Sequence, residues 1–379
     1  MIKKNEKVVI IIPIYNEADV IADTINTVLN ETLQSPGYNV EVLVFDSNST
    51  DDSVLQVKNI QQESARVHLQ SEKEKSGLGS AYLQAMRYAM HELNADIVFE
   101  FDADGSHQPK YLNPMLDKMK SCDVVVGSRY VKHGSIPQNW GWDRKLFSIL
   151  GNQVARLLLT RKHLDFTSGF RATRCSVLKK ILPDAFLSSQ YAYKLHLFWL
   201  LHKAKAKIVE HPIDFIDREI GYSKLPRNSI LDSLRVVFTL RFIELRRYFK
   251  MCLVGLSGAV IQFSVYNLSR NYYSPMHATQ LAVMCAIFSN YVFNNKFTFK
   301  LNSKIETKKI KRFALYGSYS LFIILMQSFW MHFAVTHISQ HRLLENVFVG
   351  IGIVLGSFLN YYFYSRVIWS SKLTSPKQS

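Results

Sequence analysis

Two aspartates that are separated by one residue, Asp102 and Asp104, directly follow the apolar run 97–101, whose composition predicts a β-strand. Ligands of open α/β sheets bind at the carboxyl ends of the strands. Carboxylate oxygens suit a hard cation such as Mg²⁺, which completes its shell with water and substrate phosphate. The alternative is a pair of solvated acids in a turn, where Asp is common. The spacing therefore predicts a candidate metal and phosphate site, and the surrounding segments must decide between the two interpretations.

Strand and helix patterns alternate through the first half of the chain. Strands are predicted at residues 8–12, 40–45, 67–70, 97–101 and 124–126. Helices are predicted at residues 17–29, from about residue 51, and at residues 79–92. This alternation predicts an α/β domain with a mostly parallel, Rossmann-like sheet. The segments 13–17, 46–51 and 102–104 should then meet at one edge of the sheet, where ligands of such sheets bind.

The second half of the chain is apolar and basic. Residues 241–379 contain 16 Lys and Arg but only three Glu, a net charge of +13, so the first 240 residues carry the remaining +3 of the total +16. Four stretches lack Asp, Glu, Lys and Arg: residues 251–269, 271–295, 313–340 and 346–365. Each reaches the roughly 20 residues that a spanning helix needs. Buried helices of a soluble protein are the alternative, but four of them would need an implausibly large shell. We therefore expect four transmembrane helices and no nucleic-acid partner.

The basic residues also predict the orientation in the membrane. Seven of them lie between the second and third stretch: Lys296, Lys300, Lys304, Lys308, Lys309, Lys311 and Arg312. The two opposite loops contain only Arg270 and Arg342. By the positive-inside rule, both termini and the first half of the chain should be cytoplasmic. No cleavable signal precedes the first apolar run. The four cysteines form no CxxC pair, as expected in a reducing compartment. The sequence thus predicts a multi-pass protein of the cell membrane.

The domain boundaries follow from these patterns. Residues 1–228 form the expected cytoplasmic domain, and residues 229–250 form an amphipathic helix at the membrane interface. An ordinary surface helix packed on the sheet is the alternative for this segment. Residues 251–368 form the four-span domain and residues 369–379 a cytoplasmic tail. Similar residues around Asn290 and Asn360 indicate a duplicated two-helix hairpin, and homo-oligomers could form through this domain.

Several short motifs in the first half occur in a fixed order. They are Pro13-Ile-Tyr15-Asn16-Glu17, Asp46-Ser-Asn-Ser-Thr-Asp51, Gly77-Leu-Gly79, Asp102-Ala103-Asp104, Gly127-Ser-Arg129-Tyr130, Ser168-Gly-Phe-Arg171 and Asp217-Arg218 with Gly221-Tyr-Ser223-Lys224. As an ordered set over residues 8–240, they resemble the inverting family 2 glycosyltransferases with the A-type fold, and among these the polyprenyl-phosphate (dolichyl-phosphate) mannose synthases. The four-span half is similar to the GtrA-like membrane domain.

The resemblance implies roles for individual residues. It assigns the nucleotide sugar to Pro13, Tyr15, Glu17, Asp46, Asp102, Ala103, Asp104, Arg129, Arg218 and Lys224. Asp102, Asp104 and Arg129 would be catalytic, and Ser135, Ser168 and Arg171 would contact the acceptor phosphate. The metal, Mg²⁺ or Mn²⁺, would bind Asp104 and Ser106. Two departures from the family pattern are Ser47, where a second Asp is common, and Ser106, where Gln is common.

The implied reaction is the metal-dependent transfer of a hexose to a polyprenyl or dolichyl phosphate at the membrane. Such an acceptor needs no general base, because a phosphate monoester is largely ionised at neutral pH, with a second pKa of about 6. The resemblance favours mannose from GDP-mannose, with UDP-glucose as the alternative donor. A processive polysaccharide synthase is disfavoured because no QxxRW string follows the aspartates. A lipid-carrier translocator or scaffold with an inactive transferase domain is the alternative from another functional class.

Overall fold

The computed structural model describes residues 5–33, 35, 37–138, 140–217, 228–298, 306–338 and 341–363. The chain divides into two compact units, Met1–Phe242 and Ile243–Ser379, and each is described here by itself. The predicted phosphate-binding residues Arg218 and Lys224 and the predicted tail 369–379 lie outside the described residues.

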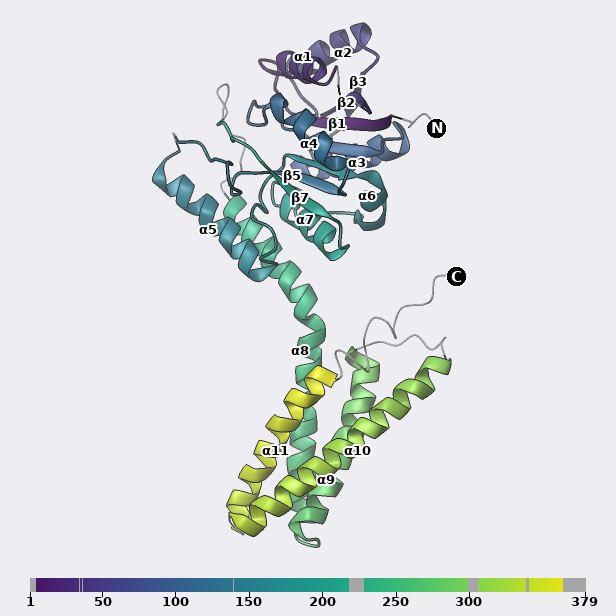
Figure 1. The fold of residues 1–379 in the computed structure, drawn as a ribbon, viewed down its shortest axis with the longest axis vertical. Helices are drawn as coiled ribbons and strands as arrows, with labels where there is room; N and C mark the ends of the chain where they lie inside the picture. The colour runs from purple at the N-terminus through teal and green to yellow at the C-terminus, as the bar shows by residue number, and fades with distance from the viewer. Residues whose placement is uncertain are drawn as a thin grey trace. The chain divides into compact units, whose positions relative to one another are not determined.

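A single mixed sheet forms the centre of the first unit (Figure 1). Within the described residues its strands are β1 Glu6–Ile14, β2 Tyr38–Asp46, β3 Val67–Ser71, β4 Ile97–Glu100, β5 Val124–Ser128, β6 Arg171–Arg174 and β7 Ile208–Pro212. They are ordered β3-β2-β1-β4-β6-β5-β7. All neighbouring pairs are parallel except those of β6, which runs antiparallel to both β4 and β5. The mostly parallel sheet predicted from the sequence is confirmed.

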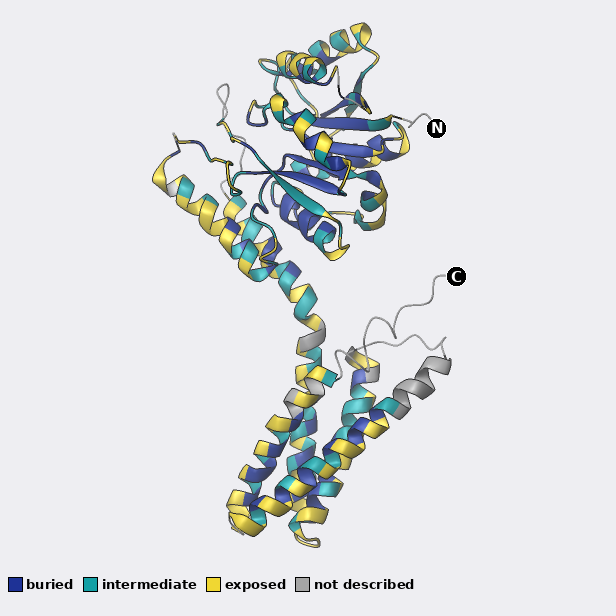
Figure 2. Cartoon of the chain, viewed as in Figure 1, coloured by how far each residue is buried: buried dark blue, intermediate teal, exposed yellow. Residues whose placement is uncertain are grey.

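Helices cover both faces of this sheet. The helices of the first unit in the described residues are α1 Ile21–Glu31, α2 Ser53–Glu63, α3 Leu78–His91, η1 Pro109–Tyr111, α4 Leu112–Met119, α5 Trp142–Leu158, α6 Cys175–Ile181 and α7 Tyr193–Lys203. In β1, alternate residues enter two different cores: Val9 and Ile11 pack with α3, α6 and α7, whereas Val8 and Ile10 pack with α1, α2 and α4. Both faces of the strand are therefore apolar, as expected for a covered parallel sheet. Figure 2 shows the strands in the middle of the sheet mostly in the dark blue of buried residues, whereas β7 is intermediate.

The five strands predicted from the sequence are all present, but β6 and β7 were not predicted. Strand β6 has the sequence Arg-Ala-Thr-Arg, which lacks the β-branched apolar run of a central strand. Its place in the sheet depends on a cross-strand partner, because Arg171 lies opposite Glu100 of β4. This pairing joins residues that are far apart in the sequence, so a local sequence pattern cannot predict it.

The order of the strands creates the site edge. The chain passes from β1 to β2 and β3 on one side of β1 and then returns to β4 on its other side. Ligands of open α/β sheets bind at such a switch point, beyond the carboxyl ends of the strands. Strand β1 is still paired with β2 at Pro13, whereas its pairing with β4 ends at Ile11. Pro13 lacks a backbone N–H, but it lies beyond the last residue of β1 that pairs with β4, so no hydrogen bond between these two strands is lost. The two strands separate at the crevice.

Helix α8 extends from Ser229 to Ser269 without interruption. Its residues Val236, Val237 and Leu240 are buried in the same core as α3 and α7. The first turns of α8 therefore pack on the sheet domain, which is the alternative interpretation of segment 229–250. The first compact unit extends to Phe242. Ile230 in the first turn of α8 and Phe238 are exposed.

The second unit is helical in its described residues. It contains the rest of α8, α9 Pro275–Phe293, the π-helical turn η2 Asn294–Thr298, α10 Glu306–His337 and α11 Arg342–Phe363. Helices thus occupy all four predicted stretches. Two segments in the described residues are long and apolar enough to cross a membrane by length and composition, Phe249–Ser269 and Leu315–His337. For the other two helices, the prediction of a transmembrane span is not confirmed.

The packing of α8 predicts where the first unit can be cut. A fragment of residues 1–242 should unfold at a higher urea concentration than a fragment of residues 1–228, because the shorter one loses Val236, Val237 and Leu240. Each buried aliphatic side chain contributes about 1.5–3 kcal/mol. Urea unfolding followed by circular dichroism measures the difference. Phe238→Ala in the longer fragment is the matched control and should change little, since Phe238 is 57% exposed. Equal stability of both fragments would contradict the assignment of these turns to the core.

Candidate active site

A cavity of about 930 Å³ opens at the carboxyl edge of the sheet. Several of the predicted site residues line it: Pro13, Tyr15, Glu17, Asp102, Ala103, Asp104, Ser106, Arg129 and Ser168. Residues of α5 and α7 and the first turns of α8 complete its wall. The structure thus brings together segments that are far apart in the sequence, as the parallel sheet predicted.

Three side chains hold the Asp102 carboxylate. The Tyr82 hydroxyl donates a hydrogen bond to Oδ1 over 2.9 Å. The Lys194 ammonium lies 3.4 Å from Oδ2, and Nε2 of His107 lies 3.7 Å from the same oxygen. Burial alone would raise the pKa of Asp102, but the positive charge of Lys194 and the hydrogen bond from Tyr82 lower it to about 2. Asp102 is therefore an ionised hydrogen-bond acceptor at any physiological pH.

His107 fixes the backbone of the aspartate turn. Its Nδ1 accepts a hydrogen bond from the Asp102 backbone N–H over 2.9 Å. The ring is only 3% exposed and stacks on Phe170, with centroids 4.6 Å apart. Burial lowers the pKa of His107, so the ring stays neutral and Nδ1 remains an acceptor. His107 is therefore a residue of the turn itself, because its ring closes the turn that carries both aspartates.

A buried ion pair lies beneath the site. Arg171 of β6 donates to Glu100 of β4 through Nε and Nη2, over 2.6 and 2.9 Å. The Tyr193 hydroxyl donates to the same carboxylate over 2.9 Å, and its ring stacks on Tyr82 with centroids 5.2 Å apart. All four side chains are fully buried. The last residue of β4 is therefore connected through two tyrosines to Asp102.

The position of Arg171 differs from the prediction. A phosphate contact was expected, but the side chain is fully buried and is not among the residues that line the cavity. Its guanidinium is already paired with Glu100. If Arg171 left this pair to bind a phosphate, the Glu100 carboxylate would stay buried without a compensating charge. The expected contact of Arg171 with the acceptor phosphate has no support in this geometry.

Asp104 and Ser106 form the second half of the aspartate turn. Oδ1 of Asp104 accepts hydrogen bonds from the Ser106 hydroxyl over 2.6 Å and from the Ser106 backbone N–H over 3.2 Å. Both residues line the cavity. Among the described residues, no group of three or more His, Cys, Asp or Glu side chains could hold a metal ion. A metal here would therefore rest on one or two carboxylates and on substrate phosphate, which is the ligand set that Mg²⁺ accepts.

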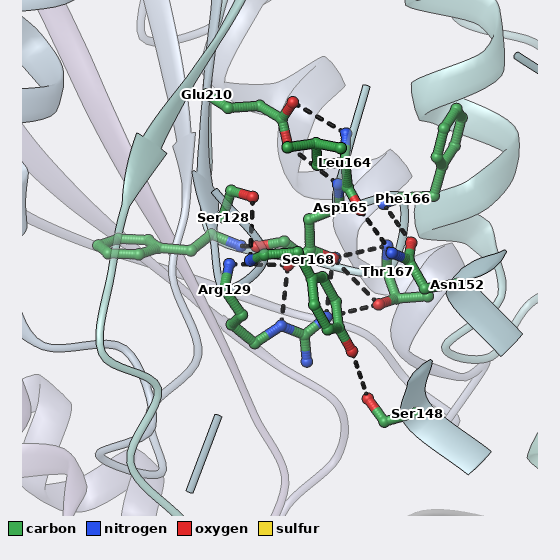
Figure 3. A network of polar contacts seen from close by, with 12 residues as sticks. Ser128, Arg129, Ser148, Asn152, Leu164, Asp165, Phe166, Thr167, Ser168 and Glu210 are labelled. Carbon is green, nitrogen blue, oxygen red and sulfur yellow. Dashed lines mark hydrogen bonds and ion pairs between the residues drawn. The ribbon is translucent and has the colours of Figure 1, made fainter. Parts of the chain in front are cut away.

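Arg129 contacts an acid that the sequence motifs did not single out. Its Nε and Nη2 donate to the two oxygens of Asp165, over 2.9 and 2.8 Å, and its backbone N–H donates to the same carboxylate (Figure 3). Nη2 also donates to the Thr167 hydroxyl. This pairing raises the pKa of Arg129 against the effect of burial, and it lowers the pKa of Asp165. The guanidinium thus lies fixed at the cavity wall with much of its charge balanced.

The loop that carries Asp165 is itself tied to the sheet. Glu210 of β7 accepts hydrogen bonds from the backbone N–H groups of Leu164 and Asp165, both over 2.9 Å (Figure 3). Asn152 of α5 accepts one from the N–H of Phe166 over 3.0 Å. The Asp165 carboxylate in turn accepts from the N–H of Ser168, which lines the cavity. The position of Ser168 therefore depends on β7 and α5.

Two further residues that were predicted to belong to the site, Asp46 and Ser135, are not among the residues that line the cavity. Asp46 is 3% exposed, and its Oδ1 accepts a hydrogen bond from the Ser49 backbone N–H over 3.1 Å. Its neighbour Ser47 lines the cavity instead. Ser135 donates to Asp214 over 2.7 Å and is not among the lining residues.

The sequence motifs missed Lys194, and they gave no role to Tyr82, Tyr193 or Asp165. Lys194 lies in the apolar helix α7, Tyr193–Lys203, where a lone lysine in the first turn was the available signal. Asp165 precedes the Ser168 motif by three residues, so its pairing with Arg129 required the fold. The residues that support the site are therefore harder to predict from the sequence than most of the residues that line it.

The chain matches Glycosyl transferase family 2 over residues 9–182 and the GtrA/DPMS transmembrane domain over residues 250–369. It is 35% identical to undecaprenyl-phosphate mannosyltransferase from Micrococcus luteus over 219 residues, which are 58% of this chain and 87% of the relative. Dolichol-phosphate mannosyltransferase from Pyrococcus furiosus is 30% identical over 375 residues, which are 96% of this chain and 100% of the relative.

Among solved structures, glucosyl-3-phosphoglycerate synthase from Mycobacterium tuberculosis, in complex with Mn²⁺, UDP and glucosyl-3-phosphoglycerate, has a TM-score of 0.45 at 19% identity. The match covers 63% of this chain and 80% of that one. The match to the GtrA/DPMS transmembrane domain, together with the two apolar helical segments among the described residues, indicates that the chain is associated with a membrane.

The ion pair beneath the site makes a prediction about stability. Arg171→Met should lower the free energy of unfolding of the fragment 1–242 by about 3–5 kcal/mol, because it leaves the Glu100 carboxylate buried and uncompensated. The double variant Arg171→Met/Glu100→Gln removes both charges, keeps an acceptor for Tyr193, and should recover much of the loss. Urea unfolding of the fragment and its two variants measures both effects. If the single variant is as stable as the parent, the pair does not hold the sheet together.

Proposed function

Because the chain belongs to the polyprenyl-phosphate and dolichyl-phosphate mannosyltransferases of glycosyltransferase family 2, we propose that it transfers mannose from GDP-mannose to a polyprenyl phosphate in a metal-dependent, inverting reaction. The family expected from the ordered motifs is confirmed. The choice of donor, the metal and the orientation in the membrane belong to the proposal.

One observation carries the proposal: two carboxylates at the end of β4 share a cavity of about 930 Å³ with cationic side chains from four other segments. A sugar and a diphosphate need different partners in such a site. The ionised Asp102, fixed by Tyr82, Lys194 and His107, is suited to accept hydrogen bonds from sugar hydroxyls. Asp104 at the cavity wall is suited to the diphosphate and its cation.

The reaction is a single displacement at the anomeric carbon. An oxygen of the lipid phosphate forms a bond to this carbon while the bond to the nucleoside diphosphate breaks, and the electron pair leaves with the diphosphate. Attack opposite the leaving group inverts the configuration. The carboxylates and cations of the site hold the two substrates in line, which converts an encounter of two molecules into a step within one complex.

A divalent ion, Mg²⁺ or Mn²⁺, would supply neutralisation of the charge that develops on the leaving diphosphate. Asp104 would hold it, with the Ser106 hydroxyl close to the same carboxylate oxygen. Ser106 positions Asp104 whether or not its hydroxyl also contacts the ion. Tyr15 and Glu17 line the same cavity and are assigned to the nucleotide, for which Arg218 and Lys224 remain predicted partners.

No side chain has to remove a proton from the acceptor. A lipid phosphate is largely a dianion at neutral pH, whereas an alcohol acceptor would need a general base. The one histidine at the aspartate turn, His107, uses Nδ1 for the backbone and has a lowered pKa because it is buried. The site is therefore better suited to a phosphate acceptor than to a hydroxyl acceptor.

The lipid substrate explains why a membrane domain accompanies the transferase. We propose that the catalytic unit and both termini face the cytoplasm, on the basis of the basic segments between the apolar stretches. The membrane domain would anchor the enzyme next to its lipid acceptor, and an oligomer formed through this domain remains part of the proposal.

A donor panel tests the proposed activity. The purified full chain is incubated with polyprenyl phosphate, Mg²⁺ or Mn²⁺, and separately GDP-mannose, UDP-glucose or UDP-GlcNAc, and the glycolipid is detected by mass spectrometry. We expect product with GDP-mannose. Product with UDP-glucose alone would replace mannose by glucose. The absence of glycolipid with every donor would contradict the transferase assignment.

The role of Asp104 gives a second prediction. Asp104→Asn should lower the rate of glycolipid formation about 100-fold or more, because it removes the charge that holds the cation at the leaving diphosphate. Chelation of divalent ions should reduce the wild-type rate to a similar level. The matched control is Asp184→Asn, a fully solvated acid of the same unit. Full activity of Asp104→Asn would contradict the proposal that the Asp104 carboxylate holds the divalent cation.

The proposed acceptor predicts the dependence of the rate on pH. The value of kcat/KM for the lipid phosphate should rise with pH through an apparent pKa of about 6, because the dianion is the nucleophile. Protonation of Asp102 should not contribute at this pH, since its pKa is lowered to about 2. A thiophosphate analogue of the acceptor, whose second pKa is lower, should shift the acid limb to lower pH. A limb that stays in place with the analogue would assign the titration to the enzyme instead.

A further inference from the structure

Lys194 is a buried cation at the wall of the cavity, and the ordered motifs assign it no role. It belongs to the first turn of α7 and is 8% exposed. Its ammonium lies 3.4 Å from the Asp102 carboxylate and 5.6 Å from the centre of the Tyr191 ring. Lysine is almost never this deeply buried unless it is paired, and among the described residues its charged partner is Asp102.

The other cations of the cavity wall are engaged elsewhere. Among the described lining residues, four carry a permanent positive charge: Lys75, Arg129, Arg144 and Lys194. Arg129 donates two hydrogen bonds to the Asp165 carboxylate, and Arg144 donates two to Asp217, over 2.7 and 3.1 Å. Lys75 lies over the ring of Tyr15, 3.3 Å from its centre, on the side assigned to the nucleotide.

Lys194 retains capacity to bind an anion. An ammonium has three N–H donors, and among the described residues Lys194 makes one hydrogen bond, to Asp102. Its length of 3.4 Å exceeds the about 2.7–2.9 Å of a close charge-assisted bond. A compact anion in the cavity can therefore approach the ammonium without displacing a strong bond.

Gly169 keeps the ammonium in this position. A Cβ atom added at Gly169 would overlap Nζ of Lys194, so a side chain there would force the lysine to move. Gly169 and Ser168 both line the cavity beside Lys194. The glycine of the Ser168 motif thus provides the space that the lysine occupies.

We infer that Lys194 binds the phosphate group of the lipid acceptor and guides it to the sugar held at Asp102. The inference rests on the proposed function. Asp102, Asp104 and the donor diphosphate all repel an incoming phosphate dianion, and a cation that touches Asp102 offsets this repulsion at the reacting carbon. The ammonium then bridges the Asp102 carboxylate and the acceptor phosphate. The ligand class is a phosphate monoester, and the lipid chain is not recognised by this residue.

Equilibrium binding to the full chain tests the inference without turnover. Citronellyl phosphate, a short isoprenyl phosphate, is titrated calorimetrically into the wild type, Lys194→Gln, Lys194→Arg and the control Lys203→Gln. The control removes the same charge from the exposed end of the same helix. Loss of a charge-assisted hydrogen bond should raise the Kd of Lys194→Gln about ten- to a hundredfold. Lys194→Arg should recover part of the affinity, and the control should bind as the wild type does. Unchanged binding by Lys194→Gln would overturn the inference.

Steady-state kinetics separate acceptor binding from a structural effect on Asp102. In Lys194→Gln the KM for polyprenyl phosphate should rise while the KM for the sugar donor stays within about twofold. Gly169→Ala should reproduce this pattern, because it displaces the ammonium and leaves the lysine in the sequence. An equal rise of both KM values would assign Lys194 to the support of Asp102 alone and overturn the inference. A wild-type chain that binds citronellyl phosphate but forms no glycolipid would instead count against the proposed function.

Discussion

The structure of the site depends on the buried ion pair between Glu100 and Arg171. The two residues face each other across β4 and β6, and both are fully buried. Ala172 is the one apolar residue of β6, and the strand runs antiparallel to both neighbours, so this pair gives it a reason to lie in the centre of the sheet. Since Glu100 ends β4, the same contact fixes the point from which the chain turns into Asp102.

A series of contacts connects this ion pair to the cavity. Tyr193 and Tyr82 stack on each other, and their hydroxyls bind Glu100 and Asp102 respectively. Each carboxylate in this series is paired with a cation: Glu100 with Arg171, and Asp102, at the cavity, with Lys194. In the proposed reaction the cavity would therefore present its carboxylates to the sugar and to a divalent cation without first rearranging, and such preorganisation lowers the barrier of a reaction.

The sequence predicted the residues that line the site better than the residues that support it. The apolar runs predicted five strands, and their parallel order alone brings Tyr15 and Asp102 to one edge. By contrast, the burial of Arg171 and the pairing of Arg129 with Asp165 depend on strands that meet only in the folded chain. Segment 229–250 shows the same limit, because an amphipathic pattern fits both a membrane surface and a protein core.

The central claim is that a lipid phosphate itself attacks the anomeric carbon, opposite the leaving diphosphate and without a general base. The configuration of the product tests this claim most directly. The full chain is supplied with α-linked GDP-mannose and either polyprenyl phosphate or the corresponding polyprenol, and the one-bond carbon–hydrogen coupling at the anomeric position is measured by NMR. The account predicts a β-linked mannosyl phosphate from the phosphate and no product from the alcohol. An α-linked product, or transfer to the alcohol, would contradict it.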